Sequence, residues 1–202
     1  SSLNGMVFVR GHRADFDGWE ASGATGWSYE DVLPHFRSME SYLPGSDDWR
    51  GGDGPISVDR LHGHHPLEYA FLDAVGEAGY GAPEDYNGGT QEGGTAFDVN
   101  IARGERSATA ALIGRIRSRA NLHIRSGAHV TRLAMEGGRA TGVCYLSGGT
   151  QHEAHADAEI ILSAGAVQSP QLLMLSGIGP GDQLRQHGIE VLADLPGVGE
   201  NL

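Results

Sequence analysis

The stretch EIILSAGAVQSPQLLMLSGIGP, Glu159–Pro180, decides the fold that we expect for this chain. It begins with an apolar run, Glu159–Ser163, passes through the small residues Ala164-Gly165-Ala166 and continues into a helical pattern. A junction of strand, small residues and helix lets a ligand approach the backbone and aims helix N–H groups at it. The glycine spacing does not match G-x-G-x-x-G, so the residues leave two interpretations open, an ordinary α/β turn and a cofactor site.

Ser169-Pro170 predicts the start of the helix in this stretch, with serine as N-cap and proline in the first turn. Gln171–Leu175 form the expected helix body, and Gly177 is the expected end. Upstream, alternating and apolar runs predict further strands, and Gly137-Gly138 is typical of a hairpin turn. With the apolar run above included, the expected strands are Leu122–Arg125, His129–Ala134, Gly142–Tyr145 and Glu159–Ser163, and His152–His155 is a short edge strand.

The first half of the chain mixes helical patterns with long polar, glycine-rich stretches. Residues 12–41 carry helical spacing, and Ser28 followed by Asp31 is a candidate helix start. The positions of proline, glycine and apolar residues predict further elements, and all of the expected helices and strands together predict an α/β fold. These are an extended segment over Met6–Val9, a strand near Ile56–Val58, a helix from Pro66 to Gly79, an irregular stretch over residues 81–106, and a helix from Ser107 to Asn121.

Composition excludes several classes of protein. The 202 residues carry 14 basic and 26 acidic side chains, for a net charge of −12, which argues against a nucleic-acid surface and a polybasic membrane patch. No apolar run approaches the roughly 20 residues of a membrane span. A single cysteine, Cys144, excludes a disulfide scaffold and a cysteine-rich zinc site. The 32 glycines indicate tight turns and close backbone approaches.

The two ends of the sequence do not read as natural termini, and we therefore expect a fragment of a longer protein. No signal peptide is evident. We expect a cytoplasmic protein, with peripheral attachment to a membrane as the alternative.

Five blocks resemble the glucose–methanol–choline (GMC) oxidoreductases, and they occur in the family's order along the whole chain. Gly165–Pro180 resembles the family's second signature, and SSLNGMVFVRG resembles the latter part of the first. The other blocks are GWSYEDVLPHFRSME (Gly26–Glu40), GERSATAAL (Gly104–Leu112) and LPGVGENL (Leu195–Leu202). The nearest likeness is to the choline-dehydrogenase-like alcohol dehydrogenases.

This resemblance implies a flavoenzyme that oxidises a small alcohol to a carbonyl by hydride transfer to FAD. It places the segment Ser2, Leu3, Asn4, Gly5 and Met6 against the isoalloxazine ring and the adjoining ribityl–pyrophosphate. The resemblance also implies a second set of contacts, to the adenosine end of FAD. In that set Val130 pairs with adenine through its backbone, and Ala164 and Gly165 pass close by.

Two departures from the family pattern matter. Some members link FAD covalently through a histidine just before that asparagine, whereas Leu3 occupies the position here, so we expect non-covalent FAD. The family's Gly-rich βαβ unit and its catalytic histidine fall outside the chain, and we nominate no catalytic residue. The electron acceptor stays open between a quinone, another acceptor and O₂.

The sequence gives less support to three other kinds of site: a histidine metal site, a calcium loop and a hydrolase triad. His62, His64 and His65 contain an H-x-H pair, but a solvated loop is the favoured interpretation over a metal site. The run Asp85–Gly89 hints at a calcium loop, yet the EF-hand spacing fails. No serine lies in a G-x-S-x-G elbow, so a hydrolase triad has no support.

We expect residues 1–43 and 107–202 to form a partial FAD-binding domain of Rossmann-like α/β type that lacks its first βαβ unit. Residues 44–106 would be a substrate-side insert or lid. Two alternatives remain: an inactive truncated product, and an unrelated acidic α/β binding module.

Overall fold

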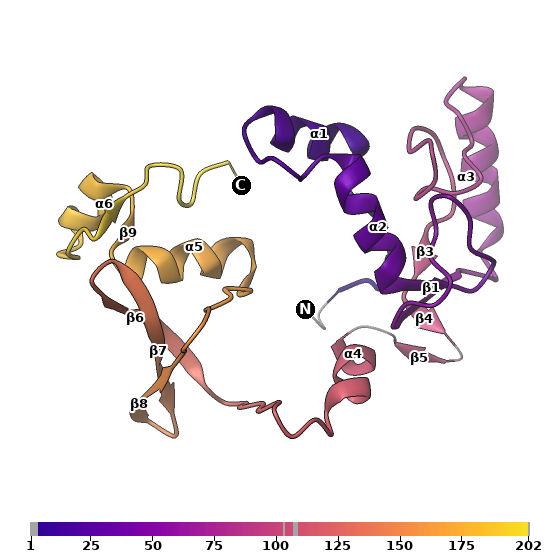
Figure 1. Cartoon of the computed structure of the whole chain (residues 1–202). Helices are drawn as coiled ribbons and strands as arrows, with labels where there is room; N and C mark the ends of the chain where they lie inside the picture. The colour runs from indigo at the N-terminus through magenta and orange to yellow at the C-terminus, as the bar shows by residue number, and fades with distance from the viewer. Residues whose placement is uncertain (1–3, 103, 107–108, 202) are drawn as a thin grey trace. The chain divides into compact units, whose positions relative to one another are not determined.

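The computed structural model describes residues 4–102, 104–106 and 109–201. The chain divides into two compact units, Ser1–Leu122 and His123–Leu202, which run from indigo to magenta and from orange to yellow in Figure 1. Ser107, the expected N-cap of a helix, lies outside the described residues.

The first unit combines helices with short strands. Its main sheet has the order β1–β2–β3, with β1 parallel and β3 antiparallel to β2, and β4 and β5 form a separate antiparallel pair. The elements are α1 (Arg13–Ala21), α2 (Tyr29–Met39), β1 (Glu40–Tyr42), β2 (Ile56–Arg60), α3 (Pro66–Glu77), β3 (Asp98–Val99), β4 (Ile101–Ala102), β5 (Glu105–Arg106) and α4 (Thr109–Ile116).

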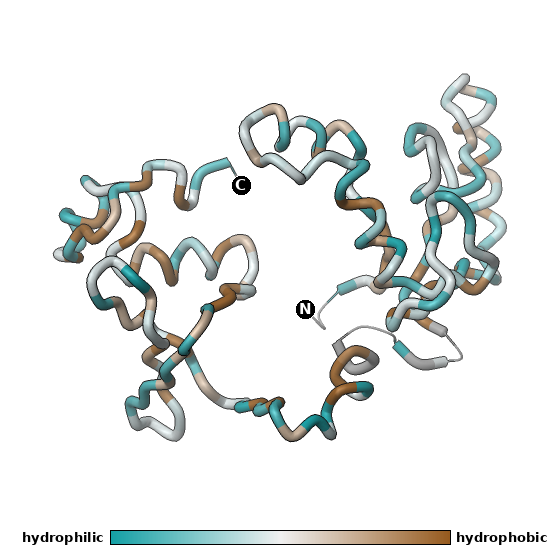
Figure 2. Tube along the Cα trace, in the orientation of Figure 1, coloured by the Kyte–Doolittle hydropathy of each residue, from teal (hydrophilic) through white to brown (hydrophobic). Residues whose placement is uncertain are grey.

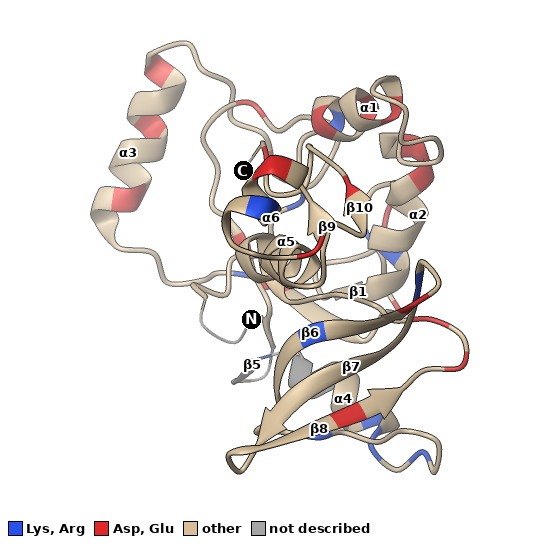
Figure 3. Ribbon diagram, turned by 90° about the vertical axis from the view of Figure 1, so that its left-hand side faces the viewer, with Lys and Arg blue, Asp and Glu red and all other residues tan. Residues whose placement is uncertain are grey.

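Local capping explains where two of these helices begin. Ser28 caps α2, where its hydroxyl accepts a hydrogen bond from the Asp31 N–H at 3.2 Å, as expected. Pro66 occupies the first turn of α3, also as expected, and His65 caps that helix. The helix ends before Gly79, whose φ of +86° suits glycine. The charged positions on α3 are acidic (Figure 3).

A small apolar core lies on the β1–β2 sheet of the first unit. Tyr42, Ile56 and Val58 are buried together, and Phe8 packs against them. Phe8 belongs to the extended segment that we expected over Met6–Val9, and this segment pairs with β3 through a bridge between Val7 and Val99. The segment Met6–Val9 is therefore anchored to this sheet.

The second unit is built on an antiparallel meander. The strands β6 (His129–Glu136), β7 (Arg139–Ser147) and β8 (Thr150–His155) pair in chain order, as expected, and Gly137 and Gly138 turn the first hairpin with φ of +57° and +80°. Helix α5 contacts β6, and the Ser176 hydroxyl accepts from the Leu133 N–H at 2.8 Å. The remaining elements are α5 (Gly165–Leu175), β9 (Ile178–Gly179), α6 (Gly181–Gln186) and β10 (Ala193–Asp194), of which β9 and β10 pair in parallel.

Four local predictions were wrong. Leu122–Arg125 and Glu159–Ser163 do not form strands, because no other segment of the described chain offers them a ladder of hydrogen bonds. Helix α5 begins at Gly165 rather than at Ser169, so Pro170 lies inside the helix. The Ser169 hydroxyl accepts instead from the Ala164 N–H at 3.0 Å. Helix α4 ends at Ile116 and not near Asn121, because the chain turns at Arg119, whose N–H bonds to the Ile116 carbonyl.

The whole of the described chain is mixed α/β, as predicted. None of the helices in the described ranges has both the length and the apolar character that a membrane crossing requires.

Candidate functional site

A cavity of about 670 Å³ lies in the second unit, between the start of β6, the run of residues 160–164 and one face of α5. Val130 and Ala164, which the family resemblance implies at the adenosine end of FAD, both line it, and Gly165 begins α5 directly after it. Its volume is within the range of small-molecule sites. The lining consists of Ala128, His129, Val130, Thr131, Val143, Ile160, Ile161, Leu162, Ser163, Ala164, Gln168, Gln171, Leu172 and Leu175.

The walls of this cavity are mostly apolar, with the polar side chains of Thr131, Ser163, Gln168 and Gln171 among them. Among the residues that the structure describes, the lining holds no Asp, Glu, Lys or Arg, and its one ionisable side chain is that of His129. The run Ile160–Leu162 before α5 is hydrophobic (Figure 2). Ile161 is 82% exposed, so an apolar surface of this unit faces outward. A mostly apolar cavity without a Lys or Arg side chain suits a flat ring system better than it suits a phosphate.

Backbone groups add to the polar part of the cavity. β6 is an edge strand in the described sheet, and the N–H and C=O groups on its outer edge are therefore available around Val130. Helix α5 starts without a side-chain cap, so its first-turn N–H groups stay open to a ligand. Gly165 reaches a φ of +93° at this start, which glycine adopts at little cost.

The other predicted contacts form one turn in the first unit. The Asn4 side-chain oxygen accepts from the Met6 N–H at 2.7 Å, and Met6 has a φ of +64°. A left-handed methionine needs such support, because that conformation costs a non-glycine residue about 1 kcal/mol or more. Asn4 and Gly5 are exposed, so this turn presents its backbone outward. Ser2 and Leu3 lie outside the described residues.

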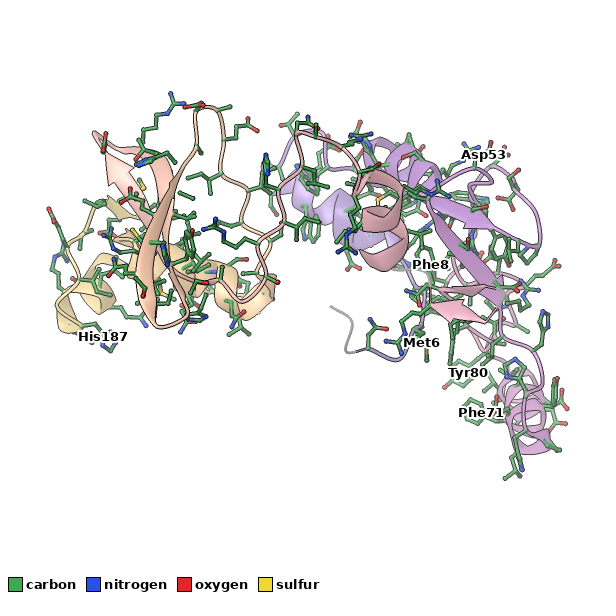
Figure 4. All side chains as sticks on the ribbon, turned by 90° about the horizontal axis from the view of Figure 1, so that it is seen from below. Met6, Phe8, Asp53, Phe71, Tyr80 and His187 are labelled. Carbon is green, nitrogen blue, oxygen red and sulfur yellow. The ribbon has the colours of Figure 1, made fainter. Side chains whose placement is uncertain are left out.

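An extended segment leads from this turn into the first unit. The Phe8 N–H donates to the Asp98 carbonyl at 2.8 Å, and the Asn100 N–H donates to the Met6 carbonyl at 2.9 Å. Figure 4 labels Met6 and Phe8 on this segment. The structure thus brings Asn4, Gly5 and Met6 together in one unit, and Val130, Ala164 and Gly165 together in the other.

A buried cluster of charged side chains beside this segment was not foreseen from the sequence. Glu40 is fully buried and accepts from Arg10 at 2.5 Å and from Arg50 at 3.1 Å. Arg50 also donates to Asp85 and to Asp98, at 2.8 Å each. Burial pulls the pKa of Arg50 down, but the bond to Asp98 and the charges of Glu40 and Asp85 raise it overall, so this guanidinium stays charged.

The histidines near α3 have structural roles. His64 lies 2.6 Å from a carboxylate oxygen of Glu68, and this hydrogen bond lowers the pKa of Glu68. His65 caps α3 by accepting from the Leu67 N–H. Over the ranges that the structure describes, no three His, Cys, Asp or Glu side chains are arranged to hold a metal ion.

Comparison with known proteins identifies what this arrangement resembles. A family model described as GMC oxidoreductase matches residues 1–202. Human mitochondrial choline dehydrogenase is 49% identical over 203 residues, which cover all of this chain and 34% of that protein, so the chain spans about a third of its relative's length.

Two solved structures share the fold. Pyridoxine 4-oxidase from Mesorbium loti has a TM-score of 0.89 and 36% identity, with 97% of this chain and 39% of that one covered. An FAD-dependent oxidoreductase from Chaetomium thermophilum also has a TM-score of 0.89, at 32% identity over 96% of this chain and 36% of that one.

Proposed function

Because the chain belongs to the GMC oxidoreductase family, whose members depend on FAD, we propose that it is part of an enzyme that oxidises a small alcohol to a carbonyl. The substrate class, a small alcohol, is proposed from one observation, the 49% identity to a choline dehydrogenase along the whole chain. Choline is therefore the first substrate to test, and other primary alcohols follow. The same match excludes the alternative of an unrelated binding module.

The roles proposed for individual residues follow their positions. The turn Asn4–Met6 contacts the isoalloxazine side of FAD, where the exposed Asn4 and Gly5 leave room for a planar ring. Val130 offers edge-strand backbone to the adenine, while Ala164 and Gly165 let the adenosine pass close to the start of α5. Ser2 and Leu3 complete the first contact, and Leu3 has no group that could bond covalently to flavin.

FAD supplies the hydride acceptor when it is bound. The residues of this chain bind and orient it, and none of them is proposed to take the proton from the alcohol. In this assignment residues 1–43 and 107–202 belong to the FAD-binding domain, and residues 44–106 form the substrate-side insert. The final electron acceptor is a quinone, another acceptor or O₂.

The test uses the complete protein that contains this chain. Purified protein should show a flavin absorption spectrum, and acid precipitation should release all of the flavin into the supernatant. Choline or another primary alcohol should then bleach the flavin without air, and turnover with a dye or with O₂ identifies the acceptor class. A protein that binds FAD but is reduced by no alcohol would be the inactive alternative, and flavin left on the precipitate would refute non-covalent binding.

The cellular location is also part of the proposal. We propose a cytoplasmic enzyme, with attachment at the surface of a membrane as the second candidate. Fractionation of cells into soluble and membrane extracts, with and without a high-salt wash, separates these two.

A further inference from the structure

The loop Asp85–Gln91 makes unusual use of one side-chain amide. Asn87 is only 1% exposed, and its side chain bonds to the backbone of two residues from the start of the chain. Its oxygen accepts from the Arg10 N–H at 2.8 Å, and its nitrogen donates to the Phe8 carbonyl at 2.9 Å. A backbone N–H only donates and a carbonyl only accepts, so these partners define the orientation of the amide.

Asn87 is itself held in place. Its N–H donates to Asp85 at 2.8 Å, and the Asp85 carboxylate accepts from Arg50 at 2.8 and 2.9 Å. Arg50 is fully buried and charged, so it ties the loop to the ion cluster around Glu40. The amide therefore projects from a rigid support.

The segment that Asn87 grips is also bonded to the residues in and beside β3. Phe8 donates to the Asp98 carbonyl, and Met6 accepts from the Asn100 N–H. Asn87 continues these bonds past the end of β3 by accepting from the N–H of the buried Arg10, and such a group is costly to leave without a partner. The segment is thus held by the β3 region at Met6 and Phe8 and by Asn87 at Phe8 and Arg10, and the turn Asn4–Met6 is attached directly to it.

We infer that Asn87 is a positioning residue for the flavin: it sets the place of the turn Asn4–Met6 by clamping the backbone of Phe8 and Arg10. This inference rests on the proposed function, because it takes that turn as part of the FAD site. Asn87 does not touch FAD in this scheme and acts through the segment alone.

The test is Asn87→Ala in the complete protein, measured in three ways. The dissociation constant for FAD should rise about ten- to a hundredfold, the range that one or two lost buried hydrogen bonds produce. The visible spectrum of the flavin that still binds should shift, since its surroundings change. In hydrogen exchange of the apoprotein, the Arg10 amide should lose its protection.

Ser176→Ala is the matched control. Its buried hydroxyl also links two backbone groups: it accepts from the Leu133 N–H at 2.8 Å and donates to the Leu172 carbonyl at 2.6 Å. This variant should lower the melting temperature by a similar amount, yet leave the flavin spectrum and the exchange at Arg10 as in the wild type.

Three results would overturn the inference. In the first, Asn87→Ala keeps the wild-type affinity and spectrum. In the second, Ser176→Ala changes both to the same extent, which leaves Asn87 with a purely structural role. In the third, the wild type binds no FAD, and the proposed function falls as well.

If Asn87→Ala does not fold, Asn87→Asp takes its place. It keeps the shape and the acceptor for Arg10 but replaces the donor to Phe8 with a carboxylate oxygen that repels the Phe8 carbonyl, and it should weaken FAD binding while the Arg10 amide stays protected. Wild-type affinity in this variant would count against the clamp.

Discussion

Removing one negative charge from the buried ion cluster should loosen the sheet that supports the first unit. Glu40 begins β1 and is fully buried, and one of its oxygens accepts from Arg10, Arg50 and the Gly51 N–H at 2.5, 3.1 and 2.8 Å. Glu40→Gln keeps the shape of the side chain but removes the negative charge that compensates the positive charges of the Arg10 and Arg50 guanidinium groups. Its amide nitrogen would also replace the other oxygen, which has no hydrogen-bond partner, and would become a buried donor without an acceptor.

The expected cost follows from this burial. Breaking a buried ion pair by removing one partner costs about 3–5 kcal/mol, a large part of the roughly 5–15 kcal/mol that stabilises a typical domain. In hydrogen exchange this corresponds to protection that falls by about 10²- to 10⁴-fold in peptides covering β1 and β2.

Glu30→Gln is the matched control for this prediction. Glu30 pairs with Arg13 at 2.8 Å but is 71% exposed, so its loss should cost no more than about 1 kcal/mol, or roughly a fivefold change in protection. Exchange is measured on the complete protein under conditions where opening is a pre-equilibrium. If the two variants differ by less than about tenfold in β1 and β2, the buried cluster does not carry the stability that we assign to it.

Three further predictions test other parts of the structure. Gly54→Ala places a Cβ 2.3 Å from the backbone nitrogen of Glu40 and should destabilise the protein by about 1–3 kcal/mol or more. Gly76→Ala adds its Cβ in open space on α3 and should stabilise the protein by about 0.5–1 kcal/mol. Thermal melts of both variants check this pair. Burial first, and the charge of Asp98 second, raise the pKa of the Tyr42 hydroxyl. The stability that the neutral hydroxyl contributes is therefore complete below pH 10 and is lost as pH rises through the raised pKa. Absorbance at 295 nm should show a phenolate that forms late in the titration and that Tyr42→Phe removes. Asn4→Leu should raise the dissociation constant for FAD about tenfold or slow flavin reduction, and stopped-flow reduction at wild-type rate with full flavin content would remove Asn4 from the site.

Several elements could be predicted because their signals are local. Ser28 and Pro66 mark helix starts through the chemistry of one or two residues, and Gly137-Gly138 marks a hairpin that the next strands follow directly. The family blocks likewise lie in contiguous stretches, and the match over residues 1–202 confirmed the resemblance.

Other predictions failed where a partner far along the chain decides the outcome. Glu159–Ser163 has the composition of a strand, but a strand needs a neighbouring ladder, and the described residues provide none there. The predicted start of α5 failed for a local reason instead: the Ser169 hydroxyl accepts from the Ala164 N–H, five residues before it, and the helix begins at Gly165. Composition alone does not distinguish these cases.

The sequence by itself determined the family, the α/β class and most of the locally capped elements of this protein. Only the tertiary structure showed the buried cluster of Glu40 and Arg50, and the grip of Asn87 on Arg10, a residue 77 positions away. The physical reason is that a buried charge or amide is stabilised by partners that the fold brings together, and the spacing of residues along the chain carries no record of those partners.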